Sequence, residues 1–198
     1  MLRFAMNKLL LAISGKRFSG KDTLAALLVE HAQKRGITLE TYAFAAESKR
    51  MFTDEQAAAG ITVDLERLQH DREYKELWRP QLTAFTMESL ARDPLVFCRS
   101  VAGRIEASST SSLVTDVRLR LEVEHLRPRF RLHLVRITRS DESRAASGWK
   151  YTPSADDHRT ETDLDDPSLW DEVLTNDGSL EELSAKAAAL TEARLVRR

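Results

Sequence analysis

Hydrophobic and polar positions follow two periods along this chain, and the changes between them indicate strands followed by helices. Residues 9–14 form a continuous apolar run of strand length, and apolar side chains then recur at three- and four-residue spacing up to Gly36. This pattern predicts a buried strand and then a helix over about residues 21–35. Residues 37–44 alternate between apolar and polar side chains, which predicts a second strand.

The same periods predict the remaining elements. Helices are expected over about residues 45–59, 71–79, from Pro80, from Asp93-Pro94, and over 119–126, 139–147 and from Ser179 onward, with strands over 113–116, 129–138 and 170–175. Pro80 either kinks one helix or opens a new one. The positions expected to face the core include Leu82, Phe85, Met87 and Leu90 after Pro80, and Leu180, Leu183, Ala187 and Leu190 in the last helix. Residues 148–169 show little periodicity and are predicted to form a mobile excursion.

Strands that alternate with helices predict an α/β fold of three layers, with a central, mainly parallel five-stranded sheet and helices on both faces. In such sheets, ligands bind beyond the carboxyl ends of the strands. Gly15, Asp116 and Asn176 each follow a predicted strand. We therefore expect these three residues at the binding edge of the sheet.

The segment between the first strand and the first helix carries the clearest chemical signal. It is Gly15-Lys16-Arg17-Phe18-Ser19-Gly20-Lys21-Asp22-Thr23. A strand, a glycine-containing loop, a lysine and a helix form the phosphate-binding P-loop arrangement. Glycines let the backbone approach a phosphate, and the loop N–H groups and the helix N-terminus face the anion. Three cations within one turn favour a bound anion over a bare glycine turn.

Two carboxylates are candidate ligands for the Mg²⁺ that accompanies ATP. Asp22 occupies the position that usually carries a Ser or Thr hydroxyl, with Thr23 next to it, and Asp116 ends a short apolar strand. Carboxylates bind Mg²⁺ directly or through water. The pattern therefore predicts ATP and Mg²⁺ as the ligands of this edge. A helix cap at the end of its strand is the alternative interpretation of Asp116.

Composition narrows the class of protein. A chain of 198 residues with 42% hydrophobic positions predicts one domain, and a net charge of −1 argues against nucleic-acid or membrane-surface partners. No apolar run approaches the length of a membrane span. The single cysteine, Cys98, excludes an internal disulfide and lies among apolar neighbours, which favours a core position and a reducing, cytoplasmic location.

Several motifs resemble those of the animal-type phosphomevalonate kinases, P-loop proteins of the nucleoside-monophosphate-kinase group. Besides the P-loop, these motifs are Tyr74-Lys75-Glu76 with Arg79, Asp93-Pro94 with Phe97-Cys98-Arg99, Val114-Thr115-Asp116-Val117-Arg118, Arg144, Gly148-Trp149-Lys150-Tyr151-Thr152-Pro153 with Asp156-Asp157, and Thr160-Glu161 with Leu164-Asp165. The resemblance covers essentially the whole chain. It implies an ATP-dependent transferase of isoprenoid biosynthesis that converts phosphomevalonate to diphosphomevalonate, as a monomer or weak dimer.

The resemblance also implies a role for particular residues. One P-loop kinase domain would span residues 1–198, with an acceptor-binding helical region at about 45–107 and a lid at about 139–169. The implied catalytic residues are Lys16, Arg17, Lys21 and Arg118; the nucleotide-binding residues are Gly15, Lys16, Arg17, Ser19, Gly20, Lys21, Asp22, Thr23, the lid arginine Arg144 and Asn176; and the acceptor-binding residues are Lys49, Lys75, Arg79, Arg99 and Arg118.

Three positions depart from the family pattern. Leu90, Leu119 and Ser147 stand where the family carries arginine, although Arg92, Arg120 and Lys150 are nearby. The acceptor therefore stays open among phosphomevalonate, a nucleoside monophosphate and another phosphorylated or phosphonate acid. Residues 175–183 also resemble the phage-type deoxynucleoside monophosphate kinases. A non-catalytic nucleotide-binding switch is the alternative of a different class.

Structural roles compete with these functional ones. Lys75 and Arg79, one helical turn apart, are also typical of a solvated helix face. Arg99 is expected to pair with Glu88 or Asp93 if it has no ligand. A solvated lid is favoured over a metal site for the Asp156-Asp157-His158 cluster, because no second His or Cys lies at ligand spacing. For Trp149, a packing anchor is favoured over an adenine platform.

Overall fold

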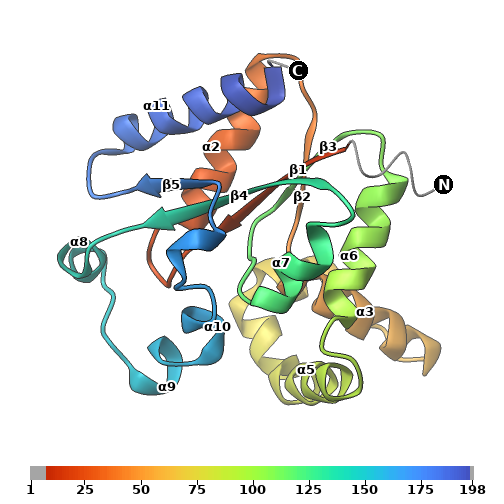
Figure 1. Cartoon of the computed structure of the whole chain (residues 1–198). Coiled ribbons are helices and arrows are strands. Elements are labelled where there is room, and N and C mark those ends of the chain that lie inside the picture. The colour runs from red at the N-terminus through yellow and green to blue at the C-terminus, as the bar shows by residue number, and fades with distance from the viewer. Residues whose placement is uncertain (1–7, 197–198) are drawn as a thin grey trace. The chain divides into compact units, whose positions relative to one another are not determined.

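The computed structural model describes residues 8–196, and its five strands form one sheet in the order β2-β3-β1-β4-β5 (Figure 1). The strands are β1 (Leu9–Ser14), β2 (Leu39–Tyr42), β3 (Ser111–Val114), β4 (Arg131–Thr138) and β5 (Glu172–Thr175). β1 pairs in parallel with β3 and β4, and β4 pairs in parallel with β5. The predicted five-stranded parallel sheet is confirmed.

Helices connect these strands. They are α2 (Lys21–Lys34), α3 (Phe44–Ala58), α4 (Leu65–His70), α5 (Arg72–Arg92), α6 (Val96–Ala107), α7 (Arg120–Leu126), α8 (Asp141–Ala146), α9 (Pro153–Asp156), α10 (Arg159–Thr162), α11 (Leu180–Thr191), the 3₁₀ turn η1 (Pro167–Leu169) and the π-helical turn η2 (Glu192–Val196). No helix within residues 8–196 is long and apolar enough to cross a membrane.

The chain divides into two compact units, which are described separately. Residues 1–41 with 108–198 form the sheet unit, and residues 42–107 form the helical unit. The helical unit spans nearly the range predicted for the acceptor-binding region, whose function stays a prediction. The predicted domain bounds of 1–198 include residues 1–7 and 197–198, which lie outside the described residues.

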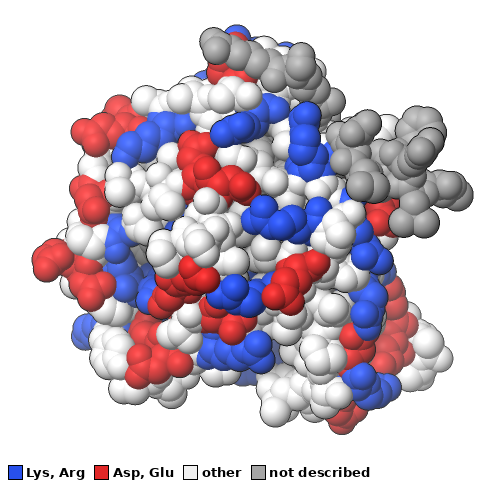
Figure 2. Space-filling view, viewed as in Figure 1, with Lys and Arg blue, Asp and Glu red and all other residues white. Residues whose placement is uncertain are grey.

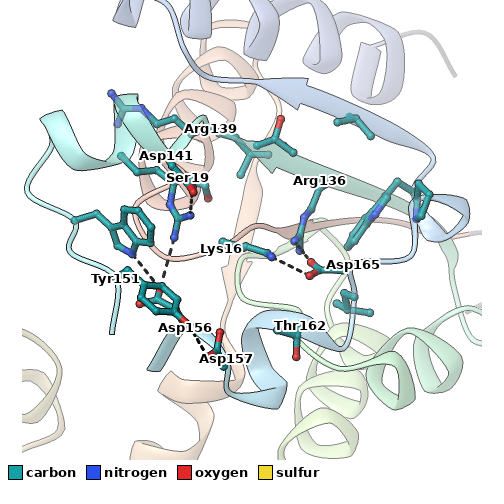
Figure 3. A pocket seen from close by; sticks show the side chains of 18 residues that line it. Lys16, Ser19, Arg136, Arg139, Asp141, Tyr151, Asp156, Asp157, Thr162 and Asp165 are labelled. Atoms are coloured by element: carbon teal, nitrogen blue, oxygen red, sulfur yellow. Dashed lines mark hydrogen bonds and ion pairs between the residues drawn. The ribbon is translucent and has the colours of Figure 1, made fainter. Parts of the chain in front are cut away.

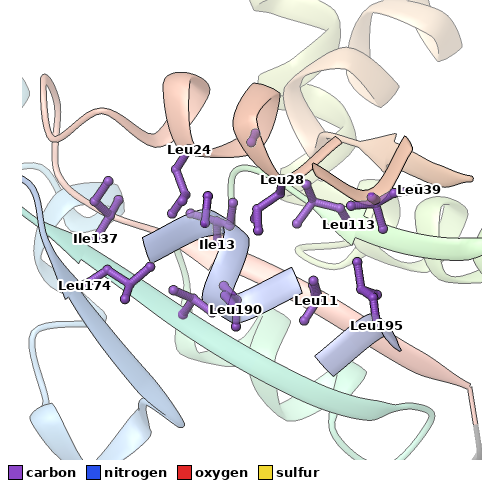
Figure 4. Close-up of a cluster of buried hydrophobic side chains, with 14 of the residues drawn as sticks. Leu11, Ile13, Leu24, Leu28, Leu39, Leu113, Ile137, Leu174, Leu190 and Leu195 are labelled. Atoms are coloured by element: carbon purple, nitrogen blue, oxygen red, sulfur yellow. The ribbon is translucent and has the colours of Figure 1, made fainter. Parts of the chain in front are cut away.

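The core of the sheet unit forms around β1, which is buried at every position. Side chains of a strand alternate between its two faces. On one face, Leu9, Leu11 and Ile13 of β1 belong to one buried cluster with apolar side chains of α2 and α11 (Figure 4). Leu10 and Ala12 point to the opposite face and are also inaccessible to solvent. Figure 1 shows α7 on that side of the sheet, away from α2 and α11.

The strand order places the binding edge between β1 and β4. From β1 the chain continues toward β2 on one side of the sheet, and from β4 it continues to β5 on the other. Such a reversal leaves a crevice at the carboxyl ends of the two strands, where ligands of open α/β sheets bind. The loop after Ser14 and residues 136–139 at the end of β4 both lie at this edge.

An aromatic cluster forms the core of the helical unit. Phe52 contacts Trp78 and Phe85, with ring centroids 6.0 and 5.7 Å apart, and Phe85 contacts Phe97 at 6.4 Å. Cys98 is buried beside them, as predicted. The cluster therefore packs α3, α5 and α6 together. The sequence pattern predicted helices in these regions.

The helix α5 corrects one prediction about Pro80 and another about which of its residues face the core. It runs without interruption through Pro80, so this proline does not open a new helix. Met87 and Leu90 are exposed, whereas Ser89 is buried. The reason is helical phase: Phe85 faces the aromatic cluster, and the position four residues later shares its face. A polar serine occupies that position.

The excursion after α8 also differs from its prediction. Residues 148–169 contain α9, α10 and η1, where the sequence pattern predicted no regular structure. Each of these elements has only three or four residues, which is too short to produce a periodic pattern. In α11, Leu180 is exposed instead of buried, since it lies in the first turn, before the helix reaches the core. Leu183, Ala187 and Leu190 are buried as predicted.

On the face shown in Figure 2, basic and acidic side chains are interspersed. This distribution agrees with the net charge of −1.

Candidate functional site

The P-loop links β1 to α2 through two glycines that the fold requires. A Cβ at Gly15 would lie 2.5 Å from Ser19 Oγ and 2.6 Å from the Ile137 carbonyl oxygen. Gly20 has a φ of +95°, and a Cβ added there would collide with the side-chain amide of Asn176. The sequence pattern assigned these glycines to the bend of the backbone and to its approach to a phosphate. The structure adds a packing reason. A side chain at Gly15 would collide with Ile137 near the end of β4, and one at Gly20 would collide with Asn176 just after β5.

Three features of the loop and of the start of α2 are typical of an anion site. Phe18 adopts a φ of +60°, which is uncommon for a bulky residue and typical of strained functional loops. The Ser19 hydroxyl is buried without a hydrogen-bond partner among residues 8–196. In the same part of the chain, no side chain caps the N-terminus of α2. Free donors at a helix start form an anion site, and these groups therefore fit the phosphates of a nucleotide.

Lys21 points back across the loop. Its Nζ donates to the Lys16 carbonyl oxygen at 3.2 Å. Burial, and then the nearby Arg118 guanidinium, hold the pKa of Lys21 below its ordinary value. A cation that is desolvated and faces another cation is stabilised by a bound anion.

A cavity of about 510 Å³ opens beside the loop, entirely within the sheet unit (Figure 3). Its basic and aromatic lining includes Lys16, Arg136, Arg139, Arg144, Trp149 and Trp170. Its acidic lining comes from Asp141 and from the excursion, through Asp156, Asp157 and Asp165. This volume and lining are typical of a small-molecule site.

Asp165 joins two cations at this cavity. It accepts a hydrogen bond from Lys16 Nζ at 2.8 Å and from Arg136 Nη2 at 2.9 Å. Arg136 is buried near the end of β4, where it also donates to Ser14 Oγ at 3.2 Å and lies over the Trp170 ring. The sequence pattern did not single out Arg136. The available signal was that Arg136 falls on the face of β4 that carries Leu132 and Leu134, near the end that meets the P-loop.

Arg144, which lies in the segment predicted to form a lid, contacts the P-loop. Its Nε donates to the Arg17 carbonyl oxygen at 2.9 Å, and its guanidinium lies 3.8 Å from the centre of the Trp149 ring. Trp149 Nε1 donates to Asp156, whose carboxylate also accepts from Arg17 Nη1 at 3.1 Å. These contacts favour the packing role of Trp149. They also show that the prediction of a solvated Asp156 is wrong, because this carboxylate is buried among cations.

The neighbouring Asp157 is exposed and accepts a hydrogen bond from the Tyr151 hydroxyl. Within residues 8–196, no three His, Cys, Asp or Glu side chains gather as a metal site would require. The Asp156-Asp157-His158 cluster is therefore not a protein-only metal cage.

Glu161 connects the loop to Arg118. Its carboxylate accepts from the backbone N–H of Arg17 at 2.7 Å and from Arg118 Nη1 at 2.6 Å. Glu122 accepts from the backbone N–H groups of Arg118 and Leu119, at 2.8 and 2.9 Å. Burial raises the pKa of Glu122 to about 7, although these two hydrogen bonds act to lower it.

The remaining nucleotide and metal candidates lie at the same edge of the sheet unit. Asn176 Nδ2 donates to the Ser19 carbonyl oxygen at 2.9 Å, so its amide fixes the loop from the end of β5. Asp22 and Thr23 are exposed in the first turn of α2. Asp116 lies two residues beyond β3, near Glu122. The contact of any of these residues with a nucleotide or with Mg²⁺ stays a prediction.

The predicted acceptor residues of the helical unit form two groups. Burial, and then the charge of Lys75, lower the pKa of Lys49, so these two cations lie close together. Arg79 pairs with Glu76, and Arg99 pairs with Asp93. The pairing predicted as an alternative for Arg99 is therefore confirmed. About half of each arginine side chain remains exposed, and their binding role stays a prediction.

Two sequence comparisons agree with one another. The family model described as phosphomevalonate kinase matches residues 13–132. The phosphomevalonate kinase of Drosophila melanogaster is 33% identical over 178 residues, which cover 86% of this chain and 89% of that protein. The matched range begins in β1 and includes the P-loop, the helical unit and Arg118.

Solved structures of other kinases share the fold. The APS kinase of Mycobacterium tuberculosis superposes with a TM-score of 0.53 at 15% identity, covering 94% of this chain and 99% of that one. A shikimate kinase from Acinetobacter baumannii gives 0.50 at 13% identity, covering 98% and 97%. At such identities the likeness concerns the fold alone. It confirms the predicted P-loop kinase fold.

Proposed function

Because the chain belongs to the phosphomevalonate kinase family, we propose that it transfers the γ-phosphoryl group of ATP to the phosphate of phosphomevalonate. The products are ADP and diphosphomevalonate. The observation that carries this proposal is that cations of the P-loop and β4 line one cavity, while Arg118, just before α7, is joined to the same loop through Glu161. Phosphoryl transfer depends mainly on positioning and on charge neutralisation, which such a cluster supplies.

The reaction brings two anions together. The bond between the γ-phosphorus and the oxygen that bridges it to the β-phosphate breaks, and an oxygen of the acceptor phosphate forms the new bond. That oxygen is already anionic near neutral pH, so no general base is required. Lys16, Arg17 and Lys21 would offset the charge of ATP, and Arg118 would bind the acceptor. Arginine suits this role because its planar guanidinium binds phosphate through two parallel hydrogen bonds.

Mg²⁺ is the metal that this chemistry implies. When bound, it would offset the negative charge of the phosphates. Asp22 and Asp116 are the residues proposed to hold it, because carboxylate oxygens are the ligands that Mg²⁺ prefers. Asp22 directly follows Lys21 at the start of α2, where the described chain offers no side-chain cap, and this fits a phosphate-bound metal at that position.

The lid is proposed to keep water from ATP. Residues 148–169 contact Lys16 and Arg17 directly, through Asp165 and Asp156. A segment that closes over the phosphates limits wasteful hydrolysis.

An acceptor screen tests the proposed function. The purified chain would be assayed for ADP release from Mg-ATP with phosphomevalonate, and in parallel with each common nucleoside monophosphate. We expect turnover with phosphomevalonate at least a hundredfold above that with any nucleotide. Turnover with a nucleoside monophosphate and none with phosphomevalonate would overturn the substrate and leave a kinase. ATP binding without turnover of any acceptor would favour the nucleotide-binding switch.

A further inference from the structure

Glu161 and Asp156 are both buried carboxylates of the predicted lid, but they accept from different backbone groups: Asp156 accepts from the N–H of Thr152, and Glu161 from the N–H of Arg17 in the P-loop. Glu161 lies in α10 and is 5% exposed. One of its oxygens accepts from the backbone N–H of Arg17, and the other from the guanidinium of Arg118. These partners lie 144 and 43 residues away in sequence, on the P-loop and just before α7.

A carboxylate that loses water needs donors in return, and Glu161 has two short ones. Lys21 adds a second favourable charge beside that of Arg118, since Glu161 acts against the lowering of the Lys21 pKa. The Arg118 side chain is only partly buried, so its own packing does not fix its direction. The direction of this guanidinium therefore depends on Glu161.

We propose that Glu161 is a positioning residue, which fixes the Arg118 guanidinium relative to the backbone of the P-loop at Arg17. This inference rests on the proposed function, in which the loop binds ATP and Arg118 binds the acceptor. One carboxylate that contacts both sets the spacing between the two phosphate sites. An error of about 1 Å in such spacing can cost about a hundredfold in rate.

The chain contains a matched control two residues later. Asp163 also accepts from one backbone N–H, that of Arg120 at 2.7 Å, and from one arginine side chain, Arg159. It lies at the end of the same short helix, and its partners are distinct from those of Glu161. Comparing Glu161→Gln with Asp163→Asn therefore separates loss of a lid carboxylate from loss of this particular bridge.

Steady-state kinetics with ATP and phosphomevalonate give the first test. We expect Glu161→Gln to lower kcat/KM for phosphomevalonate at least tenfold, with KM for ATP changed less than threefold. Asp163→Asn should change both values less than threefold. If Glu161→Gln instead lowers KM for ATP and leaves kcat unchanged or higher, the carboxylate competes with phosphates, and the proposal fails. Equal losses in the two variants would also contradict it.

A double-mutant cycle shows whether Glu161 acts through Arg118. If it does, Glu161→Gln added to Arg118→Ala should lower kcat/KM by no more than threefold beyond Arg118→Ala alone. Losses that multiply would mean that the two residues act independently, which overturns the positioning role.

Amide hydrogen exchange gives a readout that does not depend on the substrate. In Glu161→Ala the Arg17 amide loses its acceptor, and we expect its exchange to accelerate at least tenfold. Asp163→Ala should leave it unchanged. Unchanged exchange in Glu161→Ala would overturn the bridge. If the natural chain shows no phosphomevalonate turnover while this exchange accelerates, the proposed function fails and the bridge stands.

Discussion

Site cations of the sheet unit and site cations of the helical unit are held in different ways. In the sheet unit, Lys16, Arg17 and Arg118 contact carboxylates that lie 149, 139 and 43 residues away in sequence. In the helical unit, Arg79 and Arg99 pair with carboxylates only three and six residues away. Long-range bridges join separate elements and fix their spacing, whereas exposed local pairs add little stability and let the side chain reorient.

This difference indicates that the fold organises the site cations of the sheet unit in advance, Arg118 among them, whereas Arg79 and Arg99 of the helical unit can adjust to a ligand. Removing a cation of the first kind should disturb catalysis strongly. Removing one of the second kind should leave the fold almost unchanged. The following predictions test this contrast.

The largest effect is expected from Lys21→Ala. Lys21 is partly buried beside Arg118 and its charge is proposed to meet the phosphates most strongly in the transition state. By analogy with the loss of one preorganised donor, the cost should be about 3 kcal/mol, or a hundredfold or more in kcat. Lys34→Ala, which removes an exposed lysine of the same helix, is the control. Near-normal kcat in Lys21→Ala would contradict the assignment of the P-loop.

Arg118→Ala should follow, with at least a tenfold loss in kcat/KM for phosphomevalonate and an almost unchanged KM for ATP. Arg118→Lys should restore only part of the activity, because one ammonium cannot form two parallel hydrogen bonds. Full activity of the lysine variant would mean that charge alone matters. Leu119→Arg adds a related measurement: a sharp loss on the true acceptor would indicate a pocket that differs from that of the family.

One carboxylate from each unit, Glu122 and Glu47, should give opposite responses to pH. The pKa of Glu122 is raised to about 7, so the folded state binds more protons than the unfolded state between about pH 4.5 and 7. Its contribution to stability is therefore lost as pH rises through this range. We expect Glu122→Gln to raise the free energy of unfolding at pH 8 by up to about 3 kcal/mol, and to make no difference below about pH 4.5.

Glu47 of the helical unit provides the opposite case. Although burial acts against it, hydrogen bonds from Arg50, Ser100 and Arg104 hold the pKa of Glu47 below its ordinary value. Its stabilisation is present above the unfolded pKa and is lost as pH falls. Glu47→Gln should therefore destabilise at pH 8 by about 1–2 kcal/mol. Urea denaturation at pH 8 and pH 4.5 would measure both variants, and shifts of the same sign at pH 8 would contradict the opposite roles of these two carboxylates.

The smallest effect on stability is expected from Arg79→Ala. Its pair with Glu76 is exposed, so the free energy of unfolding should change by less than about 0.5 kcal/mol. KM for phosphomevalonate should still rise several-fold if Arg79 binds the acceptor. Arg67→Ala removes a similarly exposed arginine that pairs with Asp71, and it should change neither quantity. An equal KM in both variants would favour the alternative interpretation, in which Arg79 lies on a solvated helix face and binds no acceptor.

Much of the fold could be predicted from the sequence because its signals are local. The strand before Gly15, the helix after Gly20 and the helix stop at Gly36 depend on neighbours within a few residues. The misplaced positions have a local cause as well. Met87, Leu90 and Leu180 are apolar, but the phase and the ends of their helices turn them toward solvent. Neither the phase of a helix nor the position of its ends follows from the hydrophobicity of single residues.

The sequence by itself determined the phosphate-binding chemistry, because a P-loop is a continuous segment whose glycines and lysine stand at fixed spacing. Only the tertiary structure decided which charges meet at that loop. Arg136 reaches it from β4, and Glu161 and Asp165 reach it from the lid, across more than a hundred residues from Arg17 and Lys16. Such contacts depend on strand order and on the path of irregular segments, which no spacing along the chain encodes.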